Sequence, residues 1–430
     1  MQRDPKKQRD PKKAKASFLK MLGPGLVTGA ADDDPSGIGT YSQVGAQFGF
    51  AMLWTMLFSL PLMFAVQEIS ARIGRVTGKG IAANLQSYPR WITYPVIFLL
   101  FAANTINIGA DIAAMGAAGK LLLGGPSLLY AIGFALVSIV LEVFVCYQRY
   151  APWLKWMTLT LFAYVATVFF VHIPWGDALT ATVLPKIEFK KDYLMALIAV
   201  LGTTISPYLF FWQASQEVQD LRHDPDDKPL RQAPWQAPAH LSRIRSDTGI
   251  GMVFSGLVAY FIILTCAVTL HLHGIDKIDT AAQAASALRP VAGPFAFALF
   301  ALGIIGTGML AIPVLAGSAA YGVGEILRWR TGLEHKAENA KGFYGVIALA
   351  TLLGLAMNFT AIDPIKALFW SAVINGVVCV PVLLLMMLVS QNEKIMTNKF
   401  TLPWSLRGLG WLTWLVMIAA TIGMVATMGN

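Results

Sequence analysis

The sequence predicts an all-α polytopic membrane protein with about eleven transmembrane helices. Of its 430 residues, 56% are apolar and only 13% are charged, whereas an ordinary soluble domain carries about 25% charged residues. Short polar connections separate apolar stretches of the roughly 20 residues that a membrane-spanning helix needs. Most soluble folds are therefore excluded. We expect the lipid bilayer as the surroundings, with no nucleic acid and no obligate protein partner.

The chain begins with a basic tail, residues 1–20, in which Gln-Arg-Asp-Pro-Lys-Lys occurs twice in succession. No short apolar run with a cleavage site, as in a signal peptide, precedes the first span. Contact with anionic lipid is one role for such a tail, but we favour a solvated cytoplasmic segment that sets the topology.

Apolar runs, charges and prolines together locate the spans. We expect them near Leu22–Ala46, Phe50–Ile73, Ile92–Ala118, Leu128–Val145, Leu154–Val171, Leu194–Gln219, Ile250–Leu270, Phe295–Ala320, Phe343–Met357, Ile365–Val389 and Leu409–Met428. With the N-terminus in the cytoplasm, most of the 33 Lys and Arg residues fall in cytoplasmic connections. This asymmetry predicts a plasma-membrane protein with a cytoplasmic N-terminus and an extracytoplasmic C-terminus. Cys146, Cys266 and Cys379 lack paired spacing and are expected to be buried helix residues.

Two of the spans are interrupted. The first is broken by Asp-Asp-Asp-Pro-Ser-Gly at residues 32–37, and the sixth by Thr-Ile-Ser-Pro-Tyr at residues 204–208. Proline supplies each break because it lacks an N–H and clashes with the preceding turn, and the freed carbonyl groups need a partner, which a cation can be. The second break lies five spans after the first, so the two broken helices are related by inversion. Such a pair indicates a substrate site near the bilayer midplane.

The same symmetry divides the chain into two repeats. Residues 21–175 form the first repeat and residues 193–390 the second, and residues 408–430 add a last span. The second repeat includes a proline-rich, charged cytoplasmic loop at residues 220–247, which we interpret as a linker rather than a domain.

Three consecutive aspartates stand at the first break. Ionisable side chains are costly in hydrocarbon, so their presence there indicates function by default. Only one of three adjacent residues can point at a given site, and we expect Asp34 to be that residue. For Asp32 and Asp33, a position that faces water in a vestibule is the alternative.

The third span carries Asn104, Asn107 and Asp111 along one helix face. One interpretation is that this stripe lines a hydrated cavity. The other is that these side chains form hydrogen bonds between helices.

Other ionisable residues in the spans lie near the span ends. We expect Glu68, beside Arg72, to form a structural or gating ion pair, and Glu142 and Glu217 to pair or reach solvent at the interface. None of the six histidines lies in the middle of a span, so we expect no histidine proton relay.

With the broken first helix, three motifs resemble the NRAMP family of divalent-metal transporters. They are Gly-Pro-Gly at residues 23–25 with Asp-Pro-Ser-Gly at residues 34–37, Tyr-Ser-Gln-Val-Gly-Ala-Gln-Phe-Gly at residues 41–49, and Gln-Glu-Ile-Ser-Ala-Arg-Ile-Gly at residues 67–74 followed by Val-Thr-Gly-Lys-Gly at residues 76–80. The likeness covers most of spans one to ten. It implies a LeuT-like inverted 5+5 repeat, with helices 1 and 6 broken and ion ligands on both.

The sequence departs from the family pattern at both breaks. Where the family has Asp-Pro-Gly-Asn in helix one, Asp34 keeps the first ligand but Gly37 stands in place of the asparagine. In helix six, Ser206-Pro207-Tyr208 replaces Met-Pro-His, and Gln213 corresponds to a second family histidine. These departures resemble the NRAMP-related magnesium transporter branch.

The family's acidic pair in helix three is reduced to Asp111, with Ile108 at the other position. From the resemblance and the neighbouring polar residues we expect a defined set of site residues. The metal site comprises Asp34, Gly37, Asp111, Thr203, Ser206 and Asn375, and Asn107, Tyr208 and Gln213 line the cavity.

The ligand chemistry agrees with magnesium. A thioether favours soft transition metals, whereas carboxylate, carbonyl, hydroxyl and water suit magnesium and manganese. Magnesium keeps several of its waters, and Ser206 and Gly37 leave room for them. The partial negative charge at the C-terminal ends of the half-helices adds attraction.

The leading hypothesis is uptake of hydrated Mg²⁺, with Mn²⁺ as a further cargo, by alternating access without proton coupling and without a cofactor. A proton-coupled Mn²⁺/Fe²⁺ symporter and a sodium-coupled carrier of small solutes are the alternatives. We expect no enzyme, because the motifs of intramembrane hydrolases are absent. A receptor or scaffold that transports nothing does not explain two broken helices.

Overall fold

A computed structural model of the chain describes residues 28–29, 31–145, 159–360 and 363–428. Within these ranges the regular structure is helical, and eight helices are long and apolar enough to cross a membrane. The basic tail, the first residues of the predicted first and fifth spans, and Cys146 lie outside the described residues. The predicted all-α polytopic class is confirmed.

The long helices agree with the predicted spans to within several residues. The exception is the seventh span, which begins at Ala237 and not near Ile250. Seven of the eight long helices are α4 (Trp54–Thr77), α6 (Arg90–Leu123), α7 (Ser127–Phe144), α13 (Ala237–Thr269), α16 (Ala296–Ile326), α18 (Pro364–Gln391) and α20 (Trp404–Met428), and the eighth is the interrupted sixth span. The ninth predicted span is the shorter apolar helix α17 (Lys341–Met357). Of the fifth span, the described part contains η2 (Leu159–Leu161) and α9 (Phe162–Thr167). Short helices connect the rest: α5 (Ile81–Leu85), α10 (Trp175–Val183), α14 (Ala281–Ser286), α15 (Arg289–Ala292) and α19 (Glu393–Met396).

Both predicted breaks are present. Helical residues end at Asp32, and α3 (Pro35–Phe48) begins after Asp33 and Asp34. In the sixth span α11 (Lys191–Thr204) ends before Ile205 and Ser206, and α12 (Pro207–His223) continues the span. A proline occupies the first helical position after each break, where its missing N–H costs nothing and its fixed φ suits the helix.

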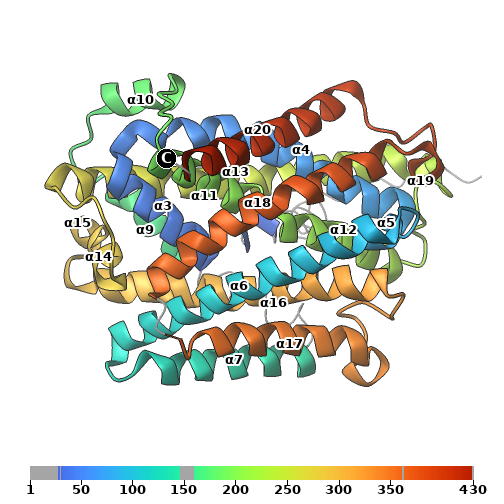
Figure 1. The fold of residues 1–430 in the computed structure, drawn as a ribbon, viewed down its shortest axis with the longest axis horizontal. Helices are drawn as coiled ribbons and strands as arrows, with labels where there is room; N and C mark the ends of the chain where they lie inside the picture. The colour runs from blue at the N-terminus through green and yellow to red at the C-terminus, as the bar shows by residue number, and fades with distance from the viewer. Residues whose placement is uncertain (1–27, 30, 146–158, 361–362, 429–430) are drawn as a thin grey trace, which may run out of the picture.

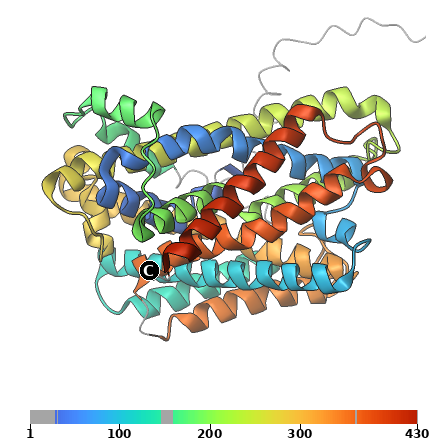
Figure 2. The ribbon, with the colours of Figure 1, turned by 45° about the horizontal axis from the view of Figure 1, so that its top comes forward.

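The helices form one bundle in which distant parts of the sequence lie side by side. α7 and α17 pack along one edge, next to α6 and α16 (Figure 1). α3 packs against α13, α18 and α11. Figure 2 shows the last helix, α20 (red), on the outside of the bundle, where it packs on α4, α11 and α18. The two breaks therefore lie inside the bundle.

Close helix contacts hold the sixth span in place. A Cβ atom added at Gly202 of α11 would lie 2.1 Å from the carbonyl oxygen of Ala372 in α18. The two backbones can approach this closely only because residue 202 has no side chain, as is common where membrane helices pack through small residues.

The connection after the sixth span is shorter than predicted. Residues 220–247 are predicted to be a loop, but α12 continues to His223 and α13 begins at Ala237. The charged residues of this segment, which had indicated a loop, form ion pairs between the two helix ends: Arg243 lies 2.5 Å from Glu217. Only residues 224–236, which include η3 (Pro234–Gln236), connect the two helices.

Two of the three predictions for glutamates near span ends are confirmed. Glu68 forms an ion pair with Arg72 at 2.7 Å, and Glu217 pairs with Arg243. The prediction for Glu142 is wrong: its side chain is buried, and neither carboxylate oxygen has a hydrogen-bond partner in the described structure. The position of a residue near a span end does not predict its burial, because burial depends on how the neighbouring helices pack.

Candidate metal site

Asp34 combines a structural role with a central position. Its backbone is extended, with φ −67° and ψ 170°, and its Oδ1 accepts a hydrogen bond from the Gly37 N–H at 2.7 Å. Asp34 is therefore the N-cap of α3, a position that favours aspartate. The N-terminal end of α3 also stabilises its negative charge.

The second oxygen of Asp34 connects two more helices. Oδ2 accepts a hydrogen bond from Asn107 Nδ2 of α6 at 2.9 Å, and the Tyr208 hydroxyl of α12 lies 3.5 Å away. The same hydroxyl donates to the carbonyl oxygen of Ala31 at 3.1 Å. Asp34 is only 2% exposed. Asp34, Asn107 and Tyr208 therefore form one buried cluster.

Asp111 lies one turn beyond Asn107 on α6 and interacts electrostatically with Asp34. Its side chain is fully buried, and neither carboxylate oxygen accepts a hydrogen bond from a described side chain. The backbone N–H of Ser36 approaches this carboxylate, but one neutral donor does not balance a buried charge, which is strongly unfavourable. A cation next to Asp34 and Asp111 would supply the missing charge.

The polar stripe of α6 forms hydrogen bonds to neighbouring segments, as one of the two interpretations predicts, whereas a hydrated cavity along it stays a prediction. Asn104 donates to the Leu315 carbonyl at 2.9 Å and to the Ser318 hydroxyl at 2.6 Å, so it joins α6 to α16. Asn107 and Asp111 face the cluster instead. The Asn107 Oδ1 atom has no hydrogen-bond partner among the described residues and is free to accept from a coordinating water.

Ser206 and Thr203 use their hydroxyl protons within the sixth span. Ser206 Oγ lies 2.7 Å from the carbonyl oxygens of both Gly202 and Thr203, two of the groups freed by the break. Thr203 Oγ1 donates toward the Val200 carbonyl at 2.8 Å and lies 2.9 Å from the hydroxyl of Tyr41. Each hydroxyl still has lone pairs for a cation.

Gly37 contributes space and a backbone N–H. A Cβ atom at this position would lie 3.2 Å from the Asp32 carbonyl oxygen and 3.3 Å from the ring of Tyr41. A larger side chain is therefore crowded from two sides in this conformation.

The remaining two predicted residues, Gln213 and Asn375, form no hydrogen bond with Asp34 in the described part of the chain. Gln213 Oε1 accepts a hydrogen bond from Thr28 Oγ1 at 2.5 Å. This is a second hydrogen bond between the two broken spans, besides the one from Tyr208 to Ala31. Asn375 is buried on α18, which packs against α3 and α11, and its Oδ1 has no partner among the described atoms. No hydrogen bond within the described chain joins Asn375 to the Asp34 cluster.

Asp32 and Asp33 turn away from Asp34 toward α13. Ser255 Oγ lies 2.5 Å from Asp32 Oδ2 and 3.2 Å from Asp33 Oδ1. Both aspartates are 1% exposed. The alternative in which they face water in a vestibule is therefore wrong for this structure, whereas the expectation that only Asp34 points at the site is consistent with it.

Sequence reasoning missed Ser255, Tyr41 and Thr28 as partners of the broken helices. It also missed Met115, one turn beyond Asp111, whose sulfur packs against Gly308 of α16. Periodicity within α6 could have indicated Met115. The other three contacts join segments far apart in the chain, for which a single sequence holds no signal.

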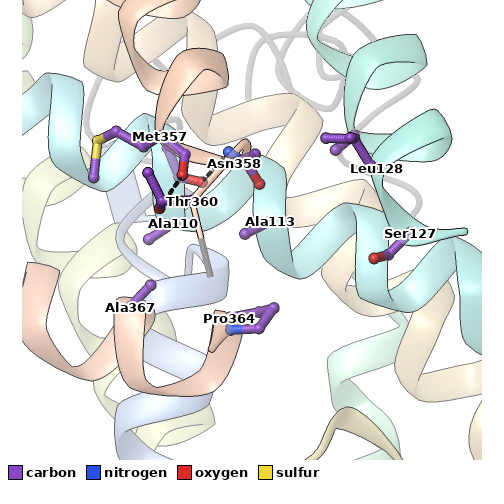
Figure 3. A pocket seen from close by; sticks show the side chains of 11 residues that line it. Ala110, Ala113, Ser127, Leu128, Met357, Asn358, Thr360, Pro364 and Ala367 are labelled. Atoms are coloured by element: carbon purple, nitrogen blue, oxygen red, sulfur yellow. Dashed lines mark hydrogen bonds between the residues drawn. The ribbon is translucent and has the colours of Figure 1, made fainter. Parts of the chain in front are cut away.

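A cavity of about 170 Å³ lies between α6, α7, α17 and α18 (Figure 3). Gly109, Ala110 and Ala113 form its α6 wall, and Asn358 donates to the Gly109 carbonyl at 3.0 Å. At 100° per residue, these positions lie on a different face of α6 from Asn107 and Asp111. Asp34, Asn107, Asp111 and Tyr208 are not among the residues that line this cavity, so it is separate from the Asp34 cluster.

The candidate ligand atoms in this cluster are the carboxylate oxygens of Asp34 and Asp111, the amide oxygen of Asn107 and the hydroxyl of Tyr208. No group of three His, Cys, Asp or Glu side chains converges within the described ranges as a fully protein-ligated metal site would require. Two carboxylates, an amide oxygen and hydroxyls instead suit a hard cation that keeps part of its water shell.

Two broken helices that meet inside a helical bundle, with buried carboxylates beside them, define a membrane transporter with the LeuT-like fold. The sequence matches the family model "Nramp: Natural resistance-associated macrophage protein-like" over residues 25–427. The chain belongs to this family.

Known proteins support the fold and the class. The chain is 26% identical over 405 residues to the "Divalent metal cation transporter MntH" of Klebsiella pneumoniae, covering 91% of this chain and 90% of that protein. It is similar to the crystal structure of a mutant of the Eremococcus coleocola manganese transporter, with a TM-score of 0.74, 15% identity and coverage of 96% and 87%. MhsT in complex with L-phenylalanine gives a TM-score of 0.60 at 12% identity, with coverage of 94% and 98%. These relatives confirm the LeuT-like fold, and those named by activity are transporters, not enzymes.

Proposed function

We propose that this protein carries hydrated Mg²⁺, with Mn²⁺ as a further cargo, across the plasma membrane by alternating access and without moving protons. Its family includes relatives named as divalent metal cation transporters, which supports a divalent cargo. The observation that carries the proposal is the cluster at the first break, where Asp34 meets Asn107 and Tyr208 and where Asp111 has no partner among the described side chains.

The preference for magnesium rests on what surrounds Asp34. The groups that approach its carboxylate are a backbone N–H, an amide and a phenol. Ser206 stands where the resemblance places a methionine, and it offers a hydroxyl oxygen instead of a soft sulfur. Gly37 offers no side-chain ligand at all. A cation bound here would retain several waters, which is the state that Mg²⁺ prefers.

The absence of proton coupling rests on the groups at the sixth span. Tyr208 and Gln213 occupy the positions where the resemblance places histidines, and neither side-chain type titrates near neutral pH. Gln213 is held by Thr28, and Tyr208 donates to Ala31. Both groups therefore have structural partners that do not depend on a proton.

A proton-coupled manganese carrier is the second candidate. The names of the relatives, a divalent metal cation transporter and a manganese transporter, favour it. Met115 adds a sulfur one turn from Asp111. The two candidates differ in their cargo ranking and in whether protons enter with the metal.

Uptake into proteoliposomes tests both points. The full chain is reconstituted with an internal Mg²⁺-sensitive dye or, in parallel, an internal pH dye, and an inside-negative potential is imposed. We expect Mg²⁺ to enter without acidification, and Asp34→Asn to be inactive as the control. Acidification that appears only when metal is added would establish the proton-coupled alternative.

We also propose the membrane arrangement that the charges predict. The basic tail at residues 1–20 and the connection after α12 lie in the cytoplasm, and the C-terminus lies outside. Residues 21–175 and 193–390 are the two inverted repeats, and residues 408–430 are an additional span. Protease accessibility of tags at the two ends, in sealed cells, tests this orientation.

A further inference from the structure

Asp32 and Asp33 form a second acidic pair that the proposed transport site does not use. Both side chains lie on the side of the first break that faces α13, and both are buried. Asp34 faces α6 and α12 instead. The two groups of carboxylates are therefore directed to different helices from one break.

The pair has too few donors for its oxygens. Ser255 Oγ is within 2.5 Å of Asp32 Oδ2 and 3.2 Å of Asp33 Oδ1, but a hydroxyl has a single proton to donate. Asp32 Oδ1 and Asp33 Oδ2 are buried and have no hydrogen-bond partner in the described part of the chain. Asp34, by comparison, accepts hydrogen bonds at both oxygens.

No basic side chain balances the pair. Neither aspartate takes part in an ion pair with Lys, Arg or His in the described ranges. Both lie at the C-terminal end of the helical residues that precede the break, where carbonyl groups carry partial negative charge. Two adjacent buried carboxylates in that field must be neutralised, by bound protons or by a bound cation, because one serine donor does not balance two negative charges.

We propose that Asp32, Asp33 and Ser255 form a second cation subsite, separate from the Asp34 site, that holds one small hard cation. Two carboxylates and a hydroxyl are the ligand chemistry of Mg²⁺ and of Na⁺. The subsite links the first break to α13, so an occupied subsite fixes these two elements relative to each other. The inference deepens the proposed function and rests on it for the class of cation.

Counting bound ions tests the proposal without relying on transport. The detergent-solubilised full chain is titrated with Mn²⁺, and free Mn²⁺ is measured by electron paramagnetic resonance. We expect two Mn²⁺ per chain in the wild type. Asp34→Asn should lose one of them, and the double variant Asp32→Asn with Asp33→Asn should lose the other. If the second ion is Na⁺, we expect the wild type to bind one Mn²⁺ and to retain ²²Na⁺. The double variant should then lose the ²²Na⁺, and Asp34→Asn should keep it.

Ser255→Ala keeps the test sharp if the double variant does not fold. We expect this variant to raise the Kd of the second ion about tenfold, which corresponds to the loss of one charge-assisted hydrogen bond. The Kd of the ion at Asp34 should not change. Ser371→Ala is the matched control, because Ser371 donates only within its own helix, to Leu368 at 2.8 Å.

Several outcomes would overturn the subsite. One is a wild type that binds a single Mn²⁺, lost in Asp34→Asn and unchanged in the double variant, without retained Na⁺; the proposed function then still stands. Another is loss of all ions in the double variant with no effect of Ser255→Ala, which would indicate one shared site. A wild type that binds no Mn²⁺ would count against both the subsite and the proposed function.

Discussion

The hydroxyl of Tyr208 donates a hydrogen bond to the carbonyl oxygen of Ala31 at 3.1 Å. Tyr208 follows the break of the sixth span, and Ala31 precedes the break of the first. This single bond therefore connects the two broken helices across the centre of the bundle. Helices 1 and 6 cannot separate at this level without losing the bond, so it stabilises the arrangement in which the two helices are in contact, which is called the closed state below.

Tyr208→Phe should weaken ion binding without abolishing transport. Loss of a hydrogen bond costs about 0.5–1.5 kcal/mol, so the closed state should become about 2- to 10-fold less populated. We expect the Mg²⁺ concentration for half-maximal uptake to rise by that factor. Tyr260→Phe is the control, because the Tyr260 hydroxyl pairs with Thr182. Equal half-saturation in Tyr208→Phe and wild type would show that this bond does not bias the closed state.

Asp34→Asn should nearly abolish Mg²⁺ uptake while the chain still folds. Asparagine is as good an N-cap as aspartate, so its amide oxygen can keep the hydrogen bond from the Gly37 N–H. The variant loses the charge and the hydrogen bond from Asn107, whose Nδ2 donor then faces another NH₂ group. Asp34→Ala removes the cap as well and should cost about 1 kcal/mol of stability in addition. Asp363→Asn is a matched control, since Asp363 caps α18 before a proline in the same way. Substantial uptake by Asp34→Asn would exclude Asp34 as the central ligand.

Asp111→Asn should weaken transport less than Asp34→Asn and should stabilise the metal-free chain. Asp111 is buried and neither of its oxygens has a side-chain partner among the described residues, so removing its charge relieves a penalty of about 1–3 kcal/mol. Thermal unfolding in the presence of a chelator should occur at a higher temperature than in the wild type. The stabilisation gained on adding Mg²⁺ should shrink. A variant that unfolds and transports like the wild type would assign Asp111 to packing alone.

Gly202→Ala should prevent α11 and α18 from packing. The added methyl group would lie 2.1 Å from the Ala372 carbonyl oxygen and 2.5 Å from the Gly376 nitrogen, and overpacking costs about 1–3 kcal/mol or more. Gly133→Ala on α7 is the control, because no atom lies within 4 Å of its added Cβ. That control should gain up to about 1 kcal/mol from helix propensity. Equal thermal stability of the two variants in detergent would contradict this account of the helix contact.

The fold and the two breaks were predictable because their signals are local. A run of apolar residues marks a span. Within a span, Asp34-Pro35 and Ser206-Pro207 each mark the start of the second half-helix, because a proline follows a polar N-cap residue. Asp34 could be selected from three aspartates because adjacent residues point in different directions. The spacing of polar residues on one helix predicted a stripe that includes Asn107, but not the hydrogen bond of Asn107 to Asp34.

The rest of the site depends on contacts between distant segments. Ser255 reaches Asp32 across 223 residues, and nothing near either residue in the sequence indicates the pairing. Ser206 could be recognised as a polar residue at a break, but not as the partner of the Gly202 and Thr203 carbonyls. Glu142 was placed at an interface because it is near a span end, whereas the packing of α7 against its neighbours buries it.

Replacing Ser206 by Met together with Gly37→Asn should shift the ion ranking away from Mg²⁺. The methionine supplies a soft thioether and the asparagine an amide, so the pair should favour desolvated Mn²⁺ or Cd²⁺ over hydrated Mg²⁺. The structure indicates that the loss of Mg²⁺ uptake will be larger than the gain in Mn²⁺ or Cd²⁺ binding. Ser206→Met leaves the Gly202 and Thr203 carbonyls without their hydroxyl partner, and at residue 37 the new Cβ would lie 3.2 Å from the Asp32 carbonyl oxygen and 3.3 Å from the Tyr41 ring.

We therefore expect Mg²⁺ uptake by the double variant to fall strongly and Cd²⁺ to compete better than it does in the wild type. Ser206→Ala is the control for Ser206→Met, because it removes the same hydroxyl without adding sulfur. The measurement is the Cd²⁺ concentration that halves uptake of the remaining Mg²⁺ or Mn²⁺. Improved Cd²⁺ competition in Ser206→Met but not in Ser206→Ala would assign the change to the thioether. A double variant with the wild-type ion ranking would show that the neighbouring side chains, and not these two positions, set the width of the site and its selectivity.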